Sequence, residues 1–514
     1  MTAFARLSAV LDALPRAPGP GGAVAVLQDG AVLARQTWGW ADMERRLPFT
    51  PETLFRICSI TKQFTCGVLL DAFPDPAMLN ADIAAALPLL AAAPTAQHLA
   101  HNQSGLRDYW ATAMLCGAPI EGGFGPDDAN RLIRRTASLH FAPGTQYSYA
   151  NHNFRLLGDI VVARIGESLA HLLRTRMFAP ANMATAQLCP ETSAMPDGTI
   201  GYEGSLEEGW RPAINRIHWT GDAGIAASLS DMIAWEHYID ASRDDPESLY
   251  ARMSVPIAFA DGGPASYGFG LSRMMIHNRL VIGHGGGLRG WRSLRFYAPA
   301  ERISVIVLLN WMGEPRKIAA DLFGALVDAS PPAAKISPDP AWAGTYLDSA
   351  TDLIARLETT TDQQIALWFG QGRETFDITA EGDAIGGSVR LARNGSSLSM
   401  VRETENLTAT LMPLNGPALR DIEGRFHSPE YDATFTCIAA GGALYGAFSG
   451  FLGNGMMQVL IPAGPDLWRL PMPRALDSAA PGDWTLRFQR DQRGQITAVT
   501  IGCWLARGIL FTRR

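Results

Sequence analysis

The sequence contains little cysteine and no long apolar run. Six of its 514 residues are cysteine, which is too few for a disulfide scaffold. No two of them have the C-x-x-C spacing typical of structural zinc sites. The longest apolar stretch, residues 83–94, is too short to span a bilayer and contains Pro88. We therefore expect no disulfide framework, no metal and no membrane span.

The sequence also lacks an excess of positive charge and an N-terminal signal segment. Its 43 Lys+Arg and 50 Asp+Glu residues give a net charge of −7, which does not favour binding to nucleic acid or to an anionic membrane. At the N-terminus, Asp12 interrupts the apolar residues. Phe4, Leu7, Leu11 and Leu14 recur there at helical spacing. This pattern predicts an amphipathic helix rather than a signal peptide, and hence a cytoplasmic protein.

Apolar residues are plentiful, at 47%, so the chain can build sizeable cores. Its length corresponds to about three domains. Strand patterns occur over residues 23–40, with a hairpin turn at Asp29-Gly30. They return in two strands between 291 and 309, and the region 52–255 between them is mainly helical in pattern. We expect one α/β domain over residues 1–330.

The composition changes after this domain. Residues 331–340 are rich in Pro and Ala, which is typical of a linker. Beyond them, short alternating strands and Gly-rich turns replace the helix patterns, as in small β-barrels. The tripeptides Gly344-Thr345-Tyr346 and Gly424-Arg425-Phe426 form a weak repeat. We expect two related β-domains, residues 341–416 and 417–514.

A first chemical motif is Ser59-Ile60-Thr61-Lys62, which an apolar helical pattern follows. On a helix, residues three apart share one face. A serine at the N-terminus of that helix gains from the positive end of its dipole when an oxyanion forms nearby. Neutral Lys62 can accept the serine proton. An N-cap serine with an exposed lysine would give the same four letters.

Two further motifs lie downstream. Tyr149-Ala150-Asn151 offers a phenol that can act as an acid or base, and an amide that can bind a substrate amide. His284-Gly285-Gly286 precedes a predicted strand, where glycines allow a substrate backbone to approach closely. His284 could supply a hydrogen-bond donor or a positive charge. Alone, each motif is also compatible with an ordinary structural role.

The order and spacing of these three motifs resemble those of the serine hydrolases of the penicillin-binding-protein and class C β-lactamase type. His284 departs from that pattern, because many members have a K-T-G lysine there. This departure argues against β-lactam hydrolysis and carboxylate recognition.

The resemblance is closer to the bacterial D-aminopeptidases. The segments that carry it are RICSITKQFTC, HNQSGLRDYW, INRIHWTGDAGI, GHGGGLRGWR, YGAFSGFLG and GCWLARG. It implies a β-lactamase-like catalytic domain, with an antiparallel sheet flanked by helices and a helical subdomain, followed by two antiparallel β-barrels. It also implies a homodimer that releases small N-terminal D-residues, such as D-Ala, from peptides, amides and esters.

The resemblance implies a role for each site residue. Ser59 is the nucleophile, and Lys62 and Tyr149 share proton transfer. Asn151 binds the acyl side, and His284 occupies the K-T-G lysine position. Gly286, Gly287 and Asp477 are further substrate-binding residues. The N–H groups of Gly287 and Ser59 would form the oxyanion hole. Asp477 belongs to the loop 473–482, which reaches the active site. A carboxylate at Asp477 is a natural partner for a substrate ammonium group.

Two alternatives stay open. The chain could be an esterase, β-lactamase or D,D-carboxypeptidase of the same superfamily, or a slowly acylating penicillin-binding sensor. Gly285, Gly287 and Gly290 satisfy G-x-G-x-x-G, but a strand pattern rather than a helix follows, so they do not indicate a dinucleotide site. We expect no cofactor.

Overall fold

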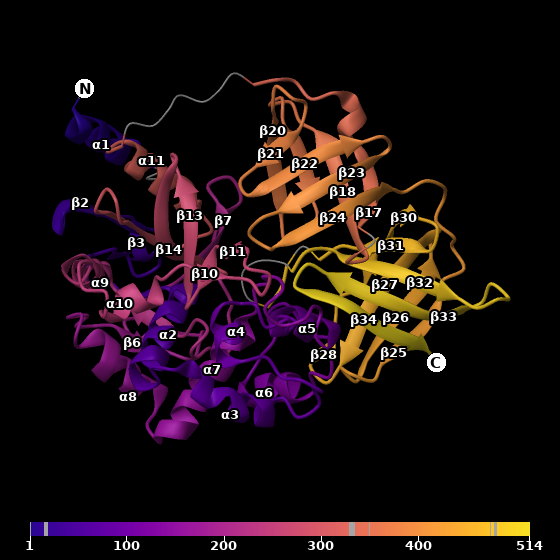
Figure 1. The fold of residues 1–514 in the computed structure, drawn as a ribbon, viewed down its shortest axis with the longest axis horizontal. Helices are drawn as coiled ribbons and strands as arrows, with labels where there is room; N and C mark the ends of the chain where they lie inside the picture. Colours follow the sequence, from indigo (N-terminus) through magenta and orange to yellow (C-terminus); the bar gives the residue numbers. More distant parts are fainter. Residues whose placement is uncertain (1, 15–18, 328–334, 349, 473, 477–480) are drawn as a thin grey trace.

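The computed structural model describes residues 2–14, 19–327, 335–348, 350–472, 474–476 and 481–514. An α/β domain carries nearly all of the helices, and two β-domains lie beside it, one above the other (Figure 1). Among the described residues, no helix combines the length and the apolarity needed to cross a membrane. Part of the predicted linker 331–340 falls outside the described residues.

The α/β domain is built on a seven-stranded antiparallel sheet. The strands lie in the order β12 (Tyr267–Gly268), β13 (Leu271–Ile276), β14 (Arg279–Leu288), β15 (Trp291–Ala298), β16 (Ile303–Leu309), β1 (Gly22–Gln28) and β2 (Ala31–Trp38). The strands predicted between 291 and 309 and over 23–40 are confirmed. Asp29 and Gly30 have φ of 51° and 72°, as a two-residue hairpin of the observed twist requires.

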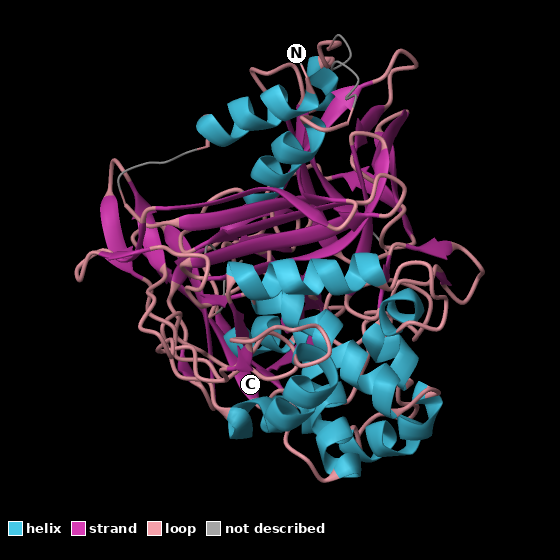
Figure 2. Cartoon of the chain, turned by 90° about the vertical axis from the view of Figure 1, so that its left-hand side faces the viewer, coloured by secondary structure: helices cyan, strands magenta, loops and turns pink. Residues whose placement is uncertain are grey.

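Helices cover both faces of this sheet (Figure 2). On one face lie α1 (Ala3–Asp12), which is the predicted N-terminal helix, and α11 (Pro315–Gly324). Leu7, Val305 and Phe323 share the core beneath them. On the other face, α9 (Leu229–Ala241) packs on β1 and β16.

The helical subdomain surrounds α2 (Thr61–Ala72), whose residues 61–70 are all buried. A helix that is buried on every side belongs to the centre of a domain. The neighbouring helices are α3 (Asn80–Ala86), α4 (Ala96–Ala100), α5 (Tyr109–Leu115), α6 (Pro126–Arg134), α7 (Asn151–Ile165), α8 (Leu169–Leu173), the π-helical η3 (Arg174–Phe178) and α10 (Leu249–Met253). Short strands form small separate sheets in this domain: β3 (Trp40–Asp42) with β4 (Leu47–Pro48), β5 (Phe55–Arg56) with β9 (Ile225–Ala227) and β6 (Gln187–Leu188), β7 (Tyr202–Ser205) with β8 (Gly209–Pro212), and β10 (Ile257–Ala258) with β11 (Pro264–Ala265).

The first β-domain, residues 344–413, is a closed barrel. Its eight strands are β17 (Gly344–Asp348), β18 (Leu353–Thr359), β19 (Ile365–Trp368), β20 (Arg373–Ile378), β21 (Ala384–Gly386), β22 (Val389–Asn394), β23 (Ser397–Arg402) and β24 (Leu407–Pro413). Pairing of β17 with β24 completes the ring, so no edge strand is left exposed.

The second β-domain, residues 424–513, closes less regularly. Its strands are β25 (Gly424–Ser428), β26 (Ala433–Ala440), β27 (Ala443–Gly450), β28 (Gly453–Asn454), β29 (Gln458–Val459), β30 (Ile461–Gly464), β31 (Leu467–Leu470), β32 (Trp484–Arg490), β33 (Ile496–Cys503) and β34 (Ala506–Arg513). Strand β29 pairs with β27 and the adjoining β30 pairs with β31. Residues 458–464 therefore connect the two ends of the sheet, which gives it a barrel-like shape.

The predicted repeat has a structural counterpart. Gly344 and Gly424 each begin the first strand of a β-domain. A Cβ on Gly344 would meet the Tyr346 ring at 3.0 Å, and one on Gly424 would meet the Phe426 ring at 3.4 Å. In both domains the glycine leaves room for the aromatic ring two residues later.

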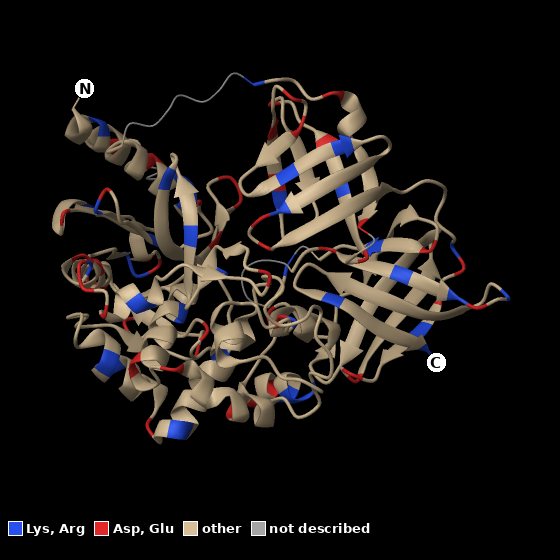
Figure 3. Ribbon diagram, viewed as in Figure 1, with Lys and Arg blue, Asp and Glu red and all other residues tan. Residues whose placement is uncertain are grey.

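Acidic and basic residues are interspersed over all three domains (Figure 3), in keeping with the small net charge. The predicted architecture, an antiparallel sheet flanked by helices with a helical subdomain, followed by two antiparallel barrel-type β-domains, is confirmed.

Candidate active site

Ser59 lies in the 3₁₀ turn η1 (Cys58–Ile60), which leads directly into α2. The preceding residue, Cys58, has φ of 51°. This left-handed conformation is unusual for a residue with a side chain, and such strain is commonly found at functional sites. The turn leaves Ser59 partly exposed, although the residues on either side of it are buried.

The side chain of Lys62 is buried and lies one turn after Ser59. Its Nζ donates to Ser59 Oγ at 3.1 Å, to Asn151 Oδ1 at 2.8 Å and to the Asp222 carbonyl at 2.8 Å. The alternative of an exposed lysine is therefore wrong. In its neutral form, Lys62 can still donate to Asn151 Oδ1 and to the Asp222 carbonyl, which leaves the lone pair of Nζ to accept the Ser59 proton.

Tyr149 lies beside this pair. Lys62 Nζ is 4.9 Å from the centre of the Tyr149 ring. Burial raises the pKa of Tyr149 well above 10, and a hydrogen bond with Ser59 opposes that rise. The phenol is therefore protonated at neutral pH and can donate a proton near Ser59.

Asn151 is the first residue of α7 and connects Lys62 to a carboxylate. Its Oδ1 accepts from Lys62, and its Nδ2 donates to Asp108 Oδ2 at 3.1 Å. Sequence reasoning missed Asp108. Asp108 lies in the segment HNQSGLRDYW that carries the family resemblance, but its position just before α5 is typical of an ordinary helix cap and indicated no role in the site.

His284 lies on β14, where both of its ring nitrogens have partners. Because a carbonyl only accepts, the Nδ1 that faces the Gly285 oxygen must be a donor. Nε2 then accepts from the Tyr267 hydroxyl at 3.0 Å. Burial and the nearby Lys62 lower the pKa of His284 from 6.5 to about 3. The positive charge that the sequence suggested is thus absent, and the imidazole is neutral.

Gly286 is needed for close packing within the protein. A Cβ there would lie 2.3 Å from the Ile57 carbonyl oxygen and 3.0 Å from Cys58 Cβ. The sequence suggested that the glycines admit a substrate backbone. At Gly286, it is the turn carrying Ser59 that approaches the strand. The Ser293 hydroxyl donates to the same Ile57 carbonyl at 3.0 Å and holds the turn there.

A cavity of about 470 Å³ brings most of the predicted residues together. The predicted residues in its lining are Ser59, Tyr149, Asn151, His284, Gly286 and Gly287. Ala475 and Pro481, from the predicted loop 473–482, also line it. Asp477 lies outside the described residues.

Both β-domains contribute walls to this cavity. The second β-domain also supplies Trp504 and Leu505, and the first supplies Gln371, Thr404 and Glu405. The contribution of the first β-domain was not predicted. Glu405 pairs with Arg402 at 3.2 Å, so the cavity wall carries a carboxylate whose charge is partly balanced. Turn residues of this kind have no sequence signal that marks them as part of a site.

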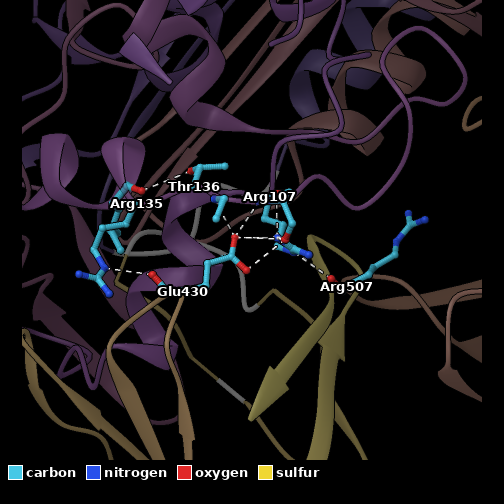
Figure 4. Close-up of polar contacts among 8 residues, drawn as sticks. Arg107, Arg135, Thr136, Glu430 and Arg507 are labelled. Atoms are coloured by element: carbon cyan, nitrogen blue, oxygen red, sulfur yellow. Dashed lines mark hydrogen bonds and ion pairs between the residues drawn. The ribbon is translucent and has the colours of Figure 1, made fainter. Parts of the chain in front are cut away.

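Polar contacts also join the second β-domain to the α/β domain around Arg107 (Figure 4). Arg107 donates to the Arg507 carbonyl at 2.8 Å and pairs with Glu430 at 3.3 Å. Glu430 also accepts from the backbone N–H groups of Ala137 and Ser138, both at 3.1 Å. These contacts fix the α5 region against the second β-domain.

Two protein families match consecutive parts of the chain: Beta-lactamase over residues 9–329, and D-aminopeptidase, domain B, over residues 335–512. The D-aminopeptidase of Gluconobacter oxydans (strain 621H) is 51% identical over 519 residues, which cover 99% of each chain. The chain belongs to the D-aminopeptidase family. Another relative, the D-aminopeptidase of Brucella ovis, is 48% identical over 511 residues, covering 99% of this chain and 98% of that one.

Solved structures share the fold. The octameric penicillin-binding protein homologue from Pyrococcus abyssi has a TM-score of 0.55 at 20% identity, covering 80% of this chain and 100% of that one. The D-amino acid amidase from Ochrobactrum anthropi SV3 complexed with D-phenylalanine has a TM-score of 0.51 at 19% identity, covering 63% of this chain and 98% of that one.

Among the described residues of the present chain, no group of His, Cys, Asp or Glu could hold a metal ion.

Proposed function

We propose that the protein is a D-stereospecific serine aminopeptidase that releases small N-terminal D-residues from peptides, amides and esters through an acyl-enzyme on Ser59. The observation that carries this proposal is the 3.1 Å contact between Lys62 Nζ and Ser59 Oγ at the edge of the cavity. It occurs in a chain that is 51% identical to a D-aminopeptidase along its whole length.

In the acylation step, Ser59 Oγ attacks the substrate carbonyl carbon while its proton passes to neutral Lys62. The N–H groups of Ser59 and Gly287 stabilise the oxyanion, and one such donor contributes about 3 kcal/mol in the transition state. The C–N bond then breaks, Tyr149 gives a proton to the leaving amine, and Lys62 passes the Ser59 proton to Tyr149, which restores both groups. Water cleaves the resulting ester and frees the D-amino acid.

Selection for a free amino group is assigned to the loop 473–482. Its described residues Ala475 and Pro481 line the cavity in which the substrate would bind. Asp477 lies between them in the sequence and is the proposed partner of the substrate ammonium. Neutral His284 adds no cation to repel this ammonium.

The test is p-nitroaniline release from D-alanine and L-alanine p-nitroanilides in the presence of EDTA, with Ser59→Ala and Lys62→Met as controls. We expect D-selective release that EDTA does not affect. Each variant should lose about 10³-fold or more, the scale of general base and nucleophile removal. Full activity in a clean Ser59→Ala preparation would disprove the mechanism.

The same assay separates the alternatives. A single stoichiometric burst without steady release would indicate a slowly acylating sensor. No release from either isomer would favour an esterase, β-lactamase or D,D-carboxypeptidase. The neutral His284 argues against the last two, because it cannot pair with a substrate carboxylate as a lysine does.

The homodimer, the cytoplasmic location and the domain limits 1–330, 341–416 and 417–514 stay predictions from the sequence. Light scattering coupled to gel filtration will test the first, and limited proteolysis at residues 331–340 will test the domain limits.

A further inference from the structure

Asp108 stands between the second β-domain and the cluster of Ser59, Lys62 and Asn151. Its side chain is buried, with the residue 1% exposed. Its carboxylate accepts from the backbone N–H of Asn151 at 3.0 Å and from the Asn151 side-chain amide at 3.1 Å. Its backbone N–H donates to the Leu505 carbonyl of the second β-domain at 2.9 Å. Asp108 therefore bonds both to the second β-domain and to Asn151 in the catalytic cluster.

The carboxylate determines which way the Asn151 amide faces. An ionised carboxylate only accepts hydrogen bonds, so it binds the amide nitrogen and repels the amide oxygen. The oxygen is left to face Lys62, whose Nζ donates to it at 2.8 Å. If the amide turned over, an N–H₂ group would face the Lys62 donor and an oxygen would face the carboxylate. Both contacts would be unfavourable.

The backbone of this segment is held from outside the α/β domain. Arg107, the residue before Asp108, bonds to the Arg507 carbonyl and pairs with Glu430 (Figure 4). Two consecutive residues are thus anchored on the second β-domain. A continuous set of hydrogen bonds runs from Leu505 through Asp108 and Asn151 to Lys62.

We propose that Asp108 is a positioning residue of the acyl-transfer site, which fixes the Asn151 amide and thereby Lys62, and through which the second β-domain holds the site in its working geometry. This inference rests on the proposed role of Lys62 as the proton acceptor for Ser59. It adds a function for the second β-domain that differs from substrate selection by the loop 473–482.

The experiment is a double-mutant cycle of Asp108→Ala and Asn151→Ala, with kcat and KM measured on D-alanine p-nitroanilide. A displaced catalytic group can cost about 100-fold in rate. We expect Asp108→Ala to lower kcat by about 100-fold, with KM changed by less than about threefold. In the Asn151→Ala background, the same substitution should cost less than about threefold in kcat, because Asp108 acts through that amide.

Two further variants keep the result interpretable. Asp108→Asn retains one acceptor oxygen for the Asn151 amide, and we expect it to regain at least about tenfold in kcat over Asp108→Ala. It also tests the proposal if the alanine variant does not fold. The matched control is Asp75→Ala, which removes an aspartate at the start of the helical turn η2 (Pro76–Leu79), on the surface. Its kcat should stay within about twofold of the wild type.

Equal losses in both Asn151 backgrounds would overturn the proposal. So would an effect confined to KM, which would mean that Asp108 contacts the substrate directly. The cycle is repeated with the rate of Ser59 labelling by a fluorophosphonate, followed by intact mass, because this readout needs no substrate. Labelling of Ser59 without turnover of the anilide would overturn the proposed function alone, and the labelling rates would still decide the role of Asp108.

Discussion

His284 illustrates how surroundings determine what a residue can do. Its ring is buried, and burial together with the charge of protonated Lys62 disfavours the charged form of the imidazole. The Nδ1 donor goes to Gly285 and the Nε2 acceptor takes the Tyr267 hydroxyl. The site therefore has a neutral polar group that accepts a hydrogen bond from Tyr267.

This neutrality leads to a pH prediction. With a pKa of about 3, His284 carries no charge from pH 5 to 8, and it cannot produce an ionisation in that range. We expect His284→Gln to change kcat/KM while leaving the midpoint of its acid limb within about 0.3 pH unit of the wild type. The measurement is kcat/KM from pH 5 to 9 for both proteins. A clear shift of the acid limb would show that His284 titrates in the working enzyme.

At the scale of elements, the contact between β14 and η1 places the nucleophile. At Gly286 the strand has no room for a side chain, because the turn contacts it there. At Gly285, the nearest atom to an added Cβ would lie 3.5 Å away. The two glycines are adjacent in sequence and differ in the space around them. They therefore form a matched pair of test sites.

We expect Gly286→Ala to lower kcat by about 100-fold or more, because the turn that carries Ser59 must move away from the strand. Gly285→Ala should stay within about fivefold of the wild type. Steady-state kinetics on D-alanine p-nitroanilide, with the melting temperature of each variant, provide the comparison. Equal activities of the two variants would mean that the turn tolerates the displacement.

Sequence patterns were informative about elements but much less so about contacts between distant ones. The hairpin at Asp29-Gly30 and the strands after Trp291 follow from local rules that neighbouring residues determine. The S-x-x-K pair is equally local, since Ser59 and Lys62 lie one helical turn apart. Glu405 enters the site only because a separate domain docks there, and Asp108 meets Asn151 across 43 positions of the chain. No local pattern records either contact.

For the whole molecule, two ion pairs between the α/β domain and the second β-domain can be compared. The comparison tests how much the pair formed by Arg107 contributes to stability. Glu430 pairs with Arg107, whose side chain is 4% exposed, whereas Asp432 pairs with Arg131 at 3.8 Å with both side chains about half exposed. We expect Glu430→Ala to cost about 3 kcal/mol of unfolding free energy, because it leaves a buried guanidinium unpaired. Asp432→Asn should cost less than about 0.5 kcal/mol.

Urea denaturation monitored by tryptophan fluorescence measures both effects. We also expect kcat to fall in Glu430→Ala, because Arg107 adjoins Asp108, and to be unchanged in Asp432→Asn. Equal small costs for both substitutions would show that the Glu430 contact is only a surface pair.

Buried histidines make the whole protein sensitive to acid. Burial lowers the pKa of His101 to about 4 and that of His152 to about 3, and His284 behaves in the same way. Below pH 6.5 these histidines bind protons in the unfolded chain but stay neutral in the folded chain. Each of these groups therefore lowers the free energy of unfolding by up to about 1.4 kcal/mol per pH unit as the pH falls from about 6.5 toward 4.

A single variant can isolate one of these contributions. Neither ring nitrogen of His152 has a hydrogen-bond partner among the described residues, so His152→Phe removes a titrating group without breaking such a bond. We expect the urea midpoint to fall less steeply from pH 7.5 to 5 in this variant. The slope of the unfolding free energy against pH should be smaller by the contribution of about one proton. At pH 7.5 the imidazole is uncharged in both the folded and the unfolded chain, so the urea midpoints of the variant and the wild type should differ little. An unchanged slope would show that His152 takes up its proton in the folded state.

The link between Arg107 and Arg507 also has a consequence for the order of biosynthesis. These residues are 400 positions apart in the chain. A ribosome that adds about 5–20 residues per second needs about 20–80 s to travel from one to the other. During that interval the nascent chain already carries Ser59 and Lys62 but not the carbonyl groups that anchor Arg107 and Asp108. Under the role proposed for Asp108, the hydrolase is made in a latent form, and synthesis of the second β-domain completes it.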